Sequence, residues 1–522
     1  MLPSFLALVE SARARHVAVA AGRATQALVD NVPRLPVLVG GEYVEEGAAT
    51  SRVVDKFTQE PLWDASDASR AVMDRAIGAA ERAERPMARM EPFARKEVLA
   101  RLAAAIVEHA EPLAVALALE VGKPIRDARV EVVRAAETCE LAGEEATRMY
   151  GEAGSLAVSQ RNAGLSYVTR RFPLGTVGAV TPFNFPLNLA AHKIAPAIAA
   201  GCPFVLKPSE RAPLSTLLLG ALLEDAAGAL LPAGAFSILP CTPDVAERMT
   251  ADERVKMISF TGSGRVGWGI KSRAGRKRVA LELGGNAGVI VAKDANVDVA
   301  VERIVFGAFY QSGQSCVSVQ RILVHETRMA EFEEKLRAAM DGLKVGDPLD
   351  EETFVGPLIT PNDASRCHAA VQHAVDSGRG TVLIGHEAVD EAHALYSPTI
   401  VRVDPAAMHA GSTEANDLLD GEIFGPVATL ETYTRFDDAL VAVNDTPFGL
   451  QAGIFTYDSR KHWRAFEELH VGGVVINDVP SIRADVQPYG GVKESGMGRE
   501  GPRYAIEDMS EIKVMVMRNA TF

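Results

Sequence analysis

Residues 176–210, TVGAVTPFNFPLNLAAHKIAPAIAAGCPFVLKPSE, alternate short apolar runs with one longer helical segment. TVGAVTP and PFVLKP have the composition of short buried strands, and NLAAHKIAPAIAAG between them has that of a helix. Two apolar strands joined by a helix are typical of a βαβ unit, in which the strands are parallel. This stretch therefore predicts an α/β fold built on a parallel sheet.

The same alternation continues on both sides of this stretch. The runs AFSILP, VKMISFTG and RVALELGG lead to Gly285, and a second alternation begins at AGVIVA (287–292). Helical periodicity fills residues 66–146, and LSYVTRRF (165–172) alternates like an exposed strand. Because 522 residues are too many for one core, we expect two to four domains.

Composition and charge argue against several classes of protein. The net charge of −14 opposes nucleic acid or an anionic membrane as the main partner. No apolar run reaches the roughly 18 residues of a membrane span. The five cysteines form no CxxC pair, and the histidines show no metal-ligand spacing. We therefore expect no metal site and a reducing compartment, the cytoplasm.

Residues 1–35 form an extension with two interpretations. Several arginines and few acids suit an organelle transit peptide, although Glu10 and Asp30 interrupt that pattern. The alternative, which we favour, is an additional amphipathic helix.

Two motifs carry groups suited to a nucleotide. GSGRVG (262–267) matches GxGxxG between a strand and a helix, where backbone amides bind phosphate, and Glu282 stands about twenty residues further on. In KPSE, Lys207 suits a ribose hydroxyl or a phosphate, and Glu210 suits both ribose hydroxyls. A solvated lysine at a strand end is the commoner case.

Three other motifs leave their chemistry open. In EIFGPV, Glu422 suits a second ribose with Phe424 against a ring, or it is a surface acid. In TPFNFP, Asn184 between two prolines is either a rigid oxyanion donor or an Asx-turn residue. In GQSC, Cys316 is a buried thiol, half of a disulfide or a nucleophile, and the residue type alone does not decide.

In this order, the motifs resemble those of the aldehyde dehydrogenase superfamily. The resemblance covers Leu38 to Ile512 and is carried by TPFNFP, KPSE, FTGS, ELGG, GQSC, EIFGPV and PYGGVKESGMGREG, with VGPLI, NDTPFGL and VGGVVIND in agreement. It implies NAD(P)-dependent oxidation of an aldehyde to an acid. It also implies a Rossmann-type nucleotide-binding domain, an α/β catalytic domain and a small β oligomerisation element.

The resemblance gives each candidate a role. Cys316 would be the nucleophile, Asn184 an oxyanion donor and Glu282 the general base. Relatives that pass the acyl group to coenzyme A lack this glutamate, so its presence favours hydrolysis. Because Glu282 then acts in catalysis, Glu210 is the better candidate for the acid that binds the ribose. Its negative charge would repel the 2′-phosphate of NADP and so favours NAD, although the adjacent Arg211 leaves NADP open. The cofactor site would comprise Thr181, Pro182, Lys207, Glu210, Gly262, Ser263, Gly267, Glu422 and Phe424.

The substrate prediction depends on Arg134 in EVVRAAE and on Arg483 in the loop before PYGG. This pair resembles relatives that oxidise aldehydes with a distal carboxylate, phosphonate or phosphate, such as succinic semialdehyde and lactaldehyde types. An arginine fork binds two anionic oxygens at once. We group Ser315, beside the cysteine, with these substrate residues.

Several alternatives remain. Arg134 pairs instead with Glu131 or Glu137 on its own helix, or the substrate is a neutral aliphatic or aromatic aldehyde. Two further readings, an inactive ligand-binding member and a cofactor-free cysteine hydrolase, agree less well with the intact motifs.

The resemblance also implies a division of the chain and an assembly. We expect an N-terminal extension (1–35), a nucleotide-binding domain (36–151 and 174–285), a catalytic domain (286–485) and an oligomerisation element (152–173 and 486–522). The strand near Leu165 to Phe172 would pair with EIKVMVM (511–517) and support a homodimer or homotetramer.

Overall fold

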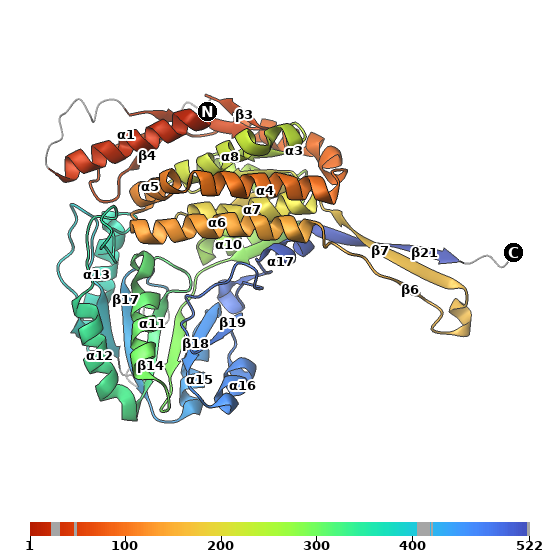
Figure 1. Ribbon diagram of the computed structural model, residues 1–522. Coiled ribbons are helices and arrows are strands. Elements are labelled where there is room, and N and C mark those ends of the chain that lie inside the picture. The colour runs from red at the N-terminus through yellow and green to blue at the C-terminus, as the bar shows by residue number, and fades with distance from the viewer. Residues whose placement is uncertain (22–31, 46–49, 404–417, 419–420, 519–522) are drawn as a thin grey trace.

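The computed structural model describes residues 1–21, 32–45, 50–403, 418 and 421–518. Two helix-covered sheets lie one above the other, and a narrow β arm projects to one side (Figure 1). The predicted α/β class is confirmed. Parts of the predicted segments, namely 22–31 of the extension, 46–49, 404–417, 419–420 and 519–522, lie outside the described residues.

The upper sheet contains the βαβ unit from which the fold was predicted. Its five central strands, β12, β11, β8, β9 and β10, are parallel to one another, and antiparallel strands close both edges. Within the described residues its order is β20 (Gly496–Met497), β12 (Arg278–Glu282), β11 (Met257–Thr261), β8 (Val177–Val180), β9 (Phe204–Lys207), β10 (Phe236–Ile238), β2 (Val37–Val39) and β3 (Glu42–Val44).

The lower sheet is the second alternation of strands and helices. Neighbouring strands in this sheet are parallel, except that the edge strand β15 is antiparallel to β16. Its order is β15 (Gly380–Ile384), β16 (Thr399–Val403), β17 (Val427–Tyr433), β14 (Val319–His325), β13 (Ala287–Val291), β18 (Gln451–Phe455) and β19 (Gly473–Ile476).

The arm is an antiparallel sheet of β21 (Ser510–Arg518), β7 (Leu165–Pro173) and β6 (Ala153–Ser155). β21 and β7 pair along their whole length, with Ile512 opposite Arg171, so the predicted strand pairing is present. The prediction that the whole of 486–522 belongs to this element is wrong, because β20 pairs with β12 in the upper sheet. A further small sheet is formed by β1 (Arg34–Leu35), β5 (Pro61–Ser66) and β4 (Thr50–Val54).

Helices cover both sheets, and local signals set several of their ends. Pro186 begins α7, and Gly201, at φ 83°, ends it in the left-handed conformation that glycine adopts easily. The upper helices are α1 (Leu2–Ala20), α3 (Arg70–Ala88), α4 (Pro92–Glu108), α5 (Ala110–Val121), α6 (Ile125–Ala146), α7 (Pro186–Ala200), α8 (Leu214–Ala227), α9 (Pro243–Ala251), α10 (Gly264–Arg273) and α17 (Pro502–Asp508). The lower helices are α11 (Val297–Phe309), α12 (Met329–Asp341), α13 (Pro361–Asp376), α15 (Phe436–Asn444) and α16 (Ser459–Glu468).

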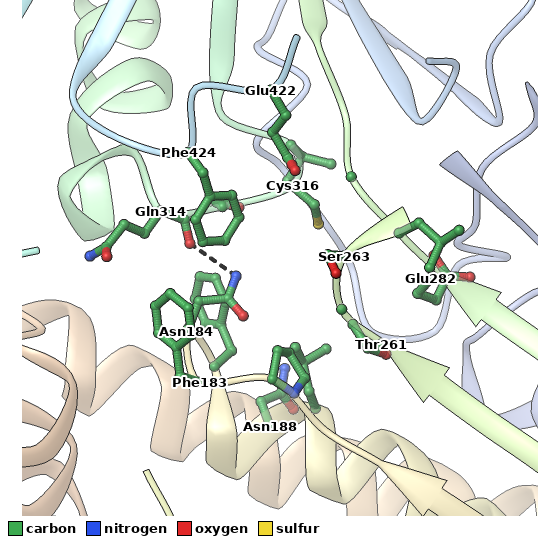
Figure 2. Close-up of a pocket in the computed structure, with 18 of the residues that line it drawn as sticks. Phe183, Asn184, Asn188, Thr261, Ser263, Glu282, Gln314, Cys316, Glu422 and Phe424 are labelled. Carbon is green, nitrogen blue, oxygen red and sulfur yellow. Dashed lines mark hydrogen bonds between the residues drawn. The ribbon is translucent and has the colours of Figure 1, made fainter. Parts of the chain in front are cut away.

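The amino ends of several lower-sheet strands and the carboxyl ends of several upper-sheet strands face a shared cavity (Figure 2). Parallel sheets typically bind ligands beyond the carboxyl ends of their strands, as the upper sheet does here, because the loops that follow the strands gather there. Three predicted site residues therefore meet here from distant parts of the sequence. Glu282 ends β12, Asn184 lies in the loop after β8, and Cys316 lies in the loop before β14.

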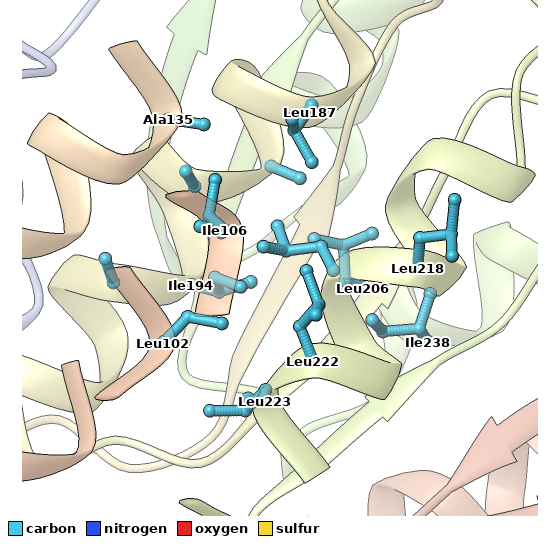
Figure 3. Close-up of a cluster of buried hydrophobic side chains, with 14 of the residues drawn as sticks. Leu102, Ile106, Ala135, Leu187, Ile194, Leu206, Leu218, Leu222, Leu223 and Ile238 are labelled. Carbon is cyan, nitrogen blue, oxygen red and sulfur yellow. The ribbon is translucent and has the colours of Figure 1, made fainter. Parts of the chain in front are cut away.

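The core below this cavity is aliphatic and continuous. Ile194 of α7 and Leu206 of β9 are fully buried, and side chains from α4 and α8 surround them (Figure 3). Burying an aliphatic side chain of this size contributes about 1.5–3 kcal/mol, so the core holds the strand ends in place.

The N-terminal extension contributes a helix to this core. In α1, Leu2, Phe5, Val9 and Ala12 are buried, which agrees with the amphipathic-helix interpretation. No single described helix is long and apolar enough to cross a membrane, and only α4 with α5, bent by 73°, passes that test as a pair.

Candidate functional site

The cavity between the sheets has a volume of about 360 Å³. Eleven of the predicted site residues line it: Arg134, Pro182, Asn184, Gly262, Ser263, Glu282, Ser315, Cys316, Glu422, Phe424 and Arg483. Thr181, Lys207, Glu210 and Gly267 do not line it. The arrangement therefore brings a thiol, an amide, two carboxyl groups and two guanidinium groups to one enclosed space.

Cys316 stands on a loop that follows a strained turn. Gln311 (φ 53°) and Ser312 (φ 56°) are left-handed although neither is glycine, and Gly313 (φ 69°) continues the turn. Such strain persists only where the surroundings impose it, and it is common at functional sites. Of the five cysteines, all described and all free, only Cys316 is partly exposed.

The Cys316 thiol is neutral at rest. Burial raises its pKa to about 12, and the nearby carboxyl groups of Glu422 and Glu282 act in the same direction. A hydrogen bond with the Tyr489 hydroxyl, 3.1 Å from Sγ, lowers the pKa. Reaction of this thiol as a nucleophile therefore requires a base and donors that stabilise the thiolate.

Asn184 is held by a backbone contact near the thiol. Its Nδ2 donates to the carbonyl of Gln314 over 2.9 Å, as Figure 2 shows, and its Oδ1 is buried without a partner. A side-chain amide carries two N–H donors, so a second one remains for a ligand. Among the residues that the structure describes, no hydrogen bond to this oxygen supports the Asx-turn alternative.

Glu282 ends β12, and its Oε2 is buried without a partner. Burial and the neighbouring Glu500 raise its pKa well above the usual range. Burial also acts on Glu500, but Lys193, 3.0 Å away, and Arg483 lower the pKa of Glu500. Within the pair, Glu500 is therefore the group that favours its charged form, and Glu282 is the carboxyl group that takes up a proton more readily, as a general base must.

Glu422 and Phe424 close another side of the cavity. The Gly285 N–H donates to Glu422 over 3.0 Å, and burial raises the pKa of Glu422 to about 7. Phe424, left-handed at φ 50°, packs edge-to-face against Phe183 with ring centroids 5.9 Å apart. A Cβ at Gly285 would collide with the carbonyl oxygen of Cys316, so only glycine permits this approach.

The predicted adenosine side lies at the neighbouring strand ends. Lys207 ends β9 and pairs with Glu210 over 3.0 Å, so the lysine is not the solvated strand-end residue of the alternative. Ser263 is the N-cap residue of α10, beside Gly262. Gly267 is buried, and a Cβ there would collide with Leu283. Close packing of α10 therefore accounts for this glycine, and its place in the cofactor site stays a prediction.

The two arginines reach the cavity from opposite segments. Arg134 of α6 binds Asp485 through both Nε (3.0 Å) and Nη2 (2.8 Å), so the alternative pairing with Glu131 or Glu137 is wrong. Glu131 instead pairs with the buried Lys123.

Asp485 and Arg483 belong to the same loop and share a histidine. His192 Nε2 lies 2.8 Å from Asp485 Oδ1 and 3.2 Å from Arg483 Nη2. Arg483 also donates to Glu500 over 3.1 Å, while its Nε has no partner. The cationic groups are thus fixed by surrounding acids before any ligand arrives.

The serines near Cys316 are bound to their surroundings. Ser312 donates to the carbonyl of Gly356, and Ser318 donates to that of Ala308. Ser315 lines the cavity and accepts a hydrogen bond from Tyr310 over 3.0 Å.

Sequence reasoning assigned no role to several residues that the structure places here. Tyr489 and Glu500 both lie within PYGGVKESGMGREG, so that motif carried a signal. His192 and Asp485 carried none. Within the ranges described, no group of three or more His, Cys, Asp or Glu side chains has the geometry to hold a metal.

Comparison with known proteins gives consistent matches. The model of the "Aldehyde dehydrogenase family" matches residues 43–515. A 3-sulfolactaldehyde dehydrogenase of Priestia aryabhattai is 39% identical over 93% of this chain and 98% of its own. A lactaldehyde dehydrogenase of Methanocaldococcus jannaschii is 40% identical over 89% and 96%. The solved aldehyde dehydrogenase 21 of Physcomitrella patens, in complex with the reaction product succinate, is 44% identical over 94% and 99%, with a TM-score of 0.89.

Proposed function

The chain belongs to the aldehyde dehydrogenase family, as its motifs predicted, and we propose that it oxidises a small aldehyde with a distal anionic group. Its general activity is NAD(P)-dependent oxidation of an aldehyde to the carboxylic acid. One observation carries the substrate class: Arg134 and Arg483 line the same cavity as the Cys316 thiol. A neutral-aldehyde dehydrogenase is the competing candidate.

The anionic group would bind between the two guanidinium groups. Asp485 uses Nε and Nη2 of Arg134, which leaves Nη1 for a ligand, and the Nε of Arg483 has no protein partner. A buried cation beside a ligand oxygen forms short charge-assisted hydrogen bonds. The relative solved with succinate and the relative that acts on sulfolactaldehyde both handle compounds that carry such a group, a carboxylate or a sulfonate.

Covalent catalysis would begin at Cys316. Its sulfur adds to the aldehyde carbon once its proton has passed to a base, and the carbonyl oxygen becomes an oxyanion. The second N–H of Asn184 would stabilise this oxyanion, and a donor of this kind contributes about 3–4 kcal/mol of barrier reduction. Collapse of the oxyanion releases a hydride and leaves a thioester on Cys316.

Hydrolysis of the thioester would depend on Glu282. Its raised pKa makes the carboxylate a stronger base, which accepts a proton from water as that water attacks the thioester carbon. The carbon–sulfur bond breaks, the acid leaves, and the thiol is restored. Hydrolysis rather than transfer to coenzyme A is the outcome we propose.

The residues present suit a nicotinamide dinucleotide. Lys207 and Glu210 would hold the adenosine ribose, and Glu422 with Phe424 the nicotinamide end, while the start of α10 offers backbone N–H groups to phosphate. When bound, the oxidised cofactor supplies the hydride acceptor. The Glu210 carboxylate would repel a 2′-phosphate, which supports a preference for NAD.

The assembly and compartment follow from two further features. β21 exposes Ile512, Val514 and Met515 on an arm, which supports pairing between copies in a homodimer or homotetramer. All five cysteines are free, which supports a reducing compartment such as the cytoplasm.

The test measures reduced cofactor and acid product with NAD and NADP. The aldehydes are succinic semialdehyde, lactaldehyde, a sulfonated aldehyde and a neutral aliphatic aldehyde. We expect Arg134→Met and Arg483→Met to lower kcat/KM for anionic aldehydes by at least about tenfold, each removing a hydrogen-bonded charge. Arg129→Met, on the exposed side of α6, is the matched control. A higher kcat/KM for the neutral aldehyde than for the anionic aldehydes, in wild type and in every variant, would refute the proposed substrate class.

A further inference from the structure

The hydroxyl of Tyr489 lies 3.1 Å from Cys316 Sγ, within hydrogen-bond distance of the thiol. The tyrosine is 4% exposed, and Val317 and Leu450 pack around it beside Cys316. Its backbone is also fixed, because its N–H donates to the carbonyl of Glu500 over 3.0 Å. The phenol therefore meets the sulfur in one defined orientation.

We propose that Tyr489 is a further catalytic residue, whose O–H donates a hydrogen bond to the Cys316 thiolate and stabilises it for attack. The inference rests on the proposed role of Cys316 as the nucleophile. In the step concerned, the sulfur–hydrogen bond breaks and the proton passes to hydroxide or another base of the solvent. The negative charge that remains on sulfur is met by the Tyr489 O–H, which keeps its own proton.

The surroundings favour a donor rather than an acceptor at Tyr489. Burial and the adjacent thiol raise the pKa of the phenol well above its ordinary value, so it stays protonated over the working pH range. A thiolate is a stronger acceptor than a thiol, and a hydrogen bond to an ionised group is about twice as strong as a neutral one. The contact thus stabilises the reactive form of Cys316 more than its resting form.

Arg483 strengthens this donor. Its guanidinium lies over the Tyr489 ring, 3.8 Å from the centroid, where the positive charge draws electron density from the ring and makes the O–H a better donor. The same arginine lines the cavity next to the proposed anionic group of the substrate. Tyr489 therefore connects the proposed substrate anchor with the nucleophile through one side chain.

Alkylation of the resting enzyme by iodoacetamide tests the proposal without substrate or cofactor. The rate at Cys316 is followed by mass spectrometry between pH 7 and 10.5 in wild type, Tyr489→Phe and Tyr310→Phe. Tyr310 is the matched control, because its hydroxyl in the same cavity bonds Ser315 rather than the thiol. The resting pKa of about 12 lies above this pH range, so a rise of about one unit lowers the thiolate fraction about tenfold at every pH measured, and we expect Tyr489→Phe to slow alkylation by that factor throughout. Tyr310→Phe leaves the rate as in wild type.

A kinetic measurement separates catalysis from a merely structural effect. In Tyr489→Phe we expect kcat/KM to fall about tenfold at pH 8 and to recover as the pH rises, because a higher pH restores the thiolate fraction. Unchanged alkylation, or a loss of activity that no pH restores, would overturn the proposal. Cys316→Ser distinguishes the two levels of inference, since turnover that survives this change refutes the proposed function itself.

Discussion

Helix α1 is fastened by a buried histidine whose charge depends on pH. His16 Nδ1 lies 2.7 Å from Asp55, and Nε2 lies 2.9 Å from Asp347, which follows α12 of the lower part of the molecule. A neutral imidazole has only one N–H, so both contacts are satisfied as hydrogen bonds only by the protonated ring. Burial lowers the pKa of His16, but these two carboxylates raise it to about 9.

We expect α1 to loosen as the pH rises from 6 to 10. The folded pKa lies above the unfolded value of 6.5, so the stabilisation is complete below pH 6.5 and is lost as the pH passes about 9. The difference between about 9 and 6.5, at about 1.4 kcal/mol per unit, corresponds to about 3 kcal/mol. Local opening of α1 becomes about 10²-fold more frequent at pH 10 than at pH 6.

Amide hydrogen exchange of residues 2–20 measures this opening, after correction for the intrinsic pH dependence of exchange. His16→Gln is the comparison at every pH, because Lys56, whose pKa burial lowers to about 8, titrates in the same range with the opposite effect. Amides of α4 serve as the internal reference. Protection of α1 that is independent of pH in wild type, or equally dependent in His16→Gln, would refute the reasoning.

Three further changes give distinct outcomes. Glu282→Gln is expected to produce a burst of reduced cofactor equal to the enzyme present and then turnover reduced at least about 10²-fold, seen by stopped-flow absorbance; unchanged steady turnover contradicts its role as base. Asp485→Asn removes the charged partner that holds Arg134 and is expected to raise KM for an anionic aldehyde at least about tenfold. A neutral aldehyde is the control, and an equal rise in KM for both aldehydes would contradict the role of Arg134 in binding the anionic group. Gly285→Ala places a Cβ against the carbonyl of Cys316 and is expected to lower kcat/KM about 10²-fold, measured beside thermal unfolding; wild-type activity contradicts the close approach.

Much of the fold could be predicted from local pattern. Apolar runs such as PFVLKP and the helical period of NLAAHKIAPAIAAG are properties of short segments, and β9 and α7 form where these patterns predict them. The pairing of LSYVTRRF with EIKVMVM is what the family resemblance implies, and the structure contains it. The division of the C-terminal segment did not follow from local pattern, because the two residues of β20 are too few to show any periodicity.

For this protein, the sequence by itself determined the α/β class, the family and the presence of Cys316, Asn184 and Glu282, because each is recorded in a contiguous motif. Tertiary structure alone decided which groups meet. Arg134 and Asp485 are 351 residues apart in the chain and Cys316 and Tyr489 are 173 apart, yet each pair is within hydrogen-bond distance. Such contacts depend on how two sheets and their loops pack, and no local spacing or residue preference encodes a distance across that packing.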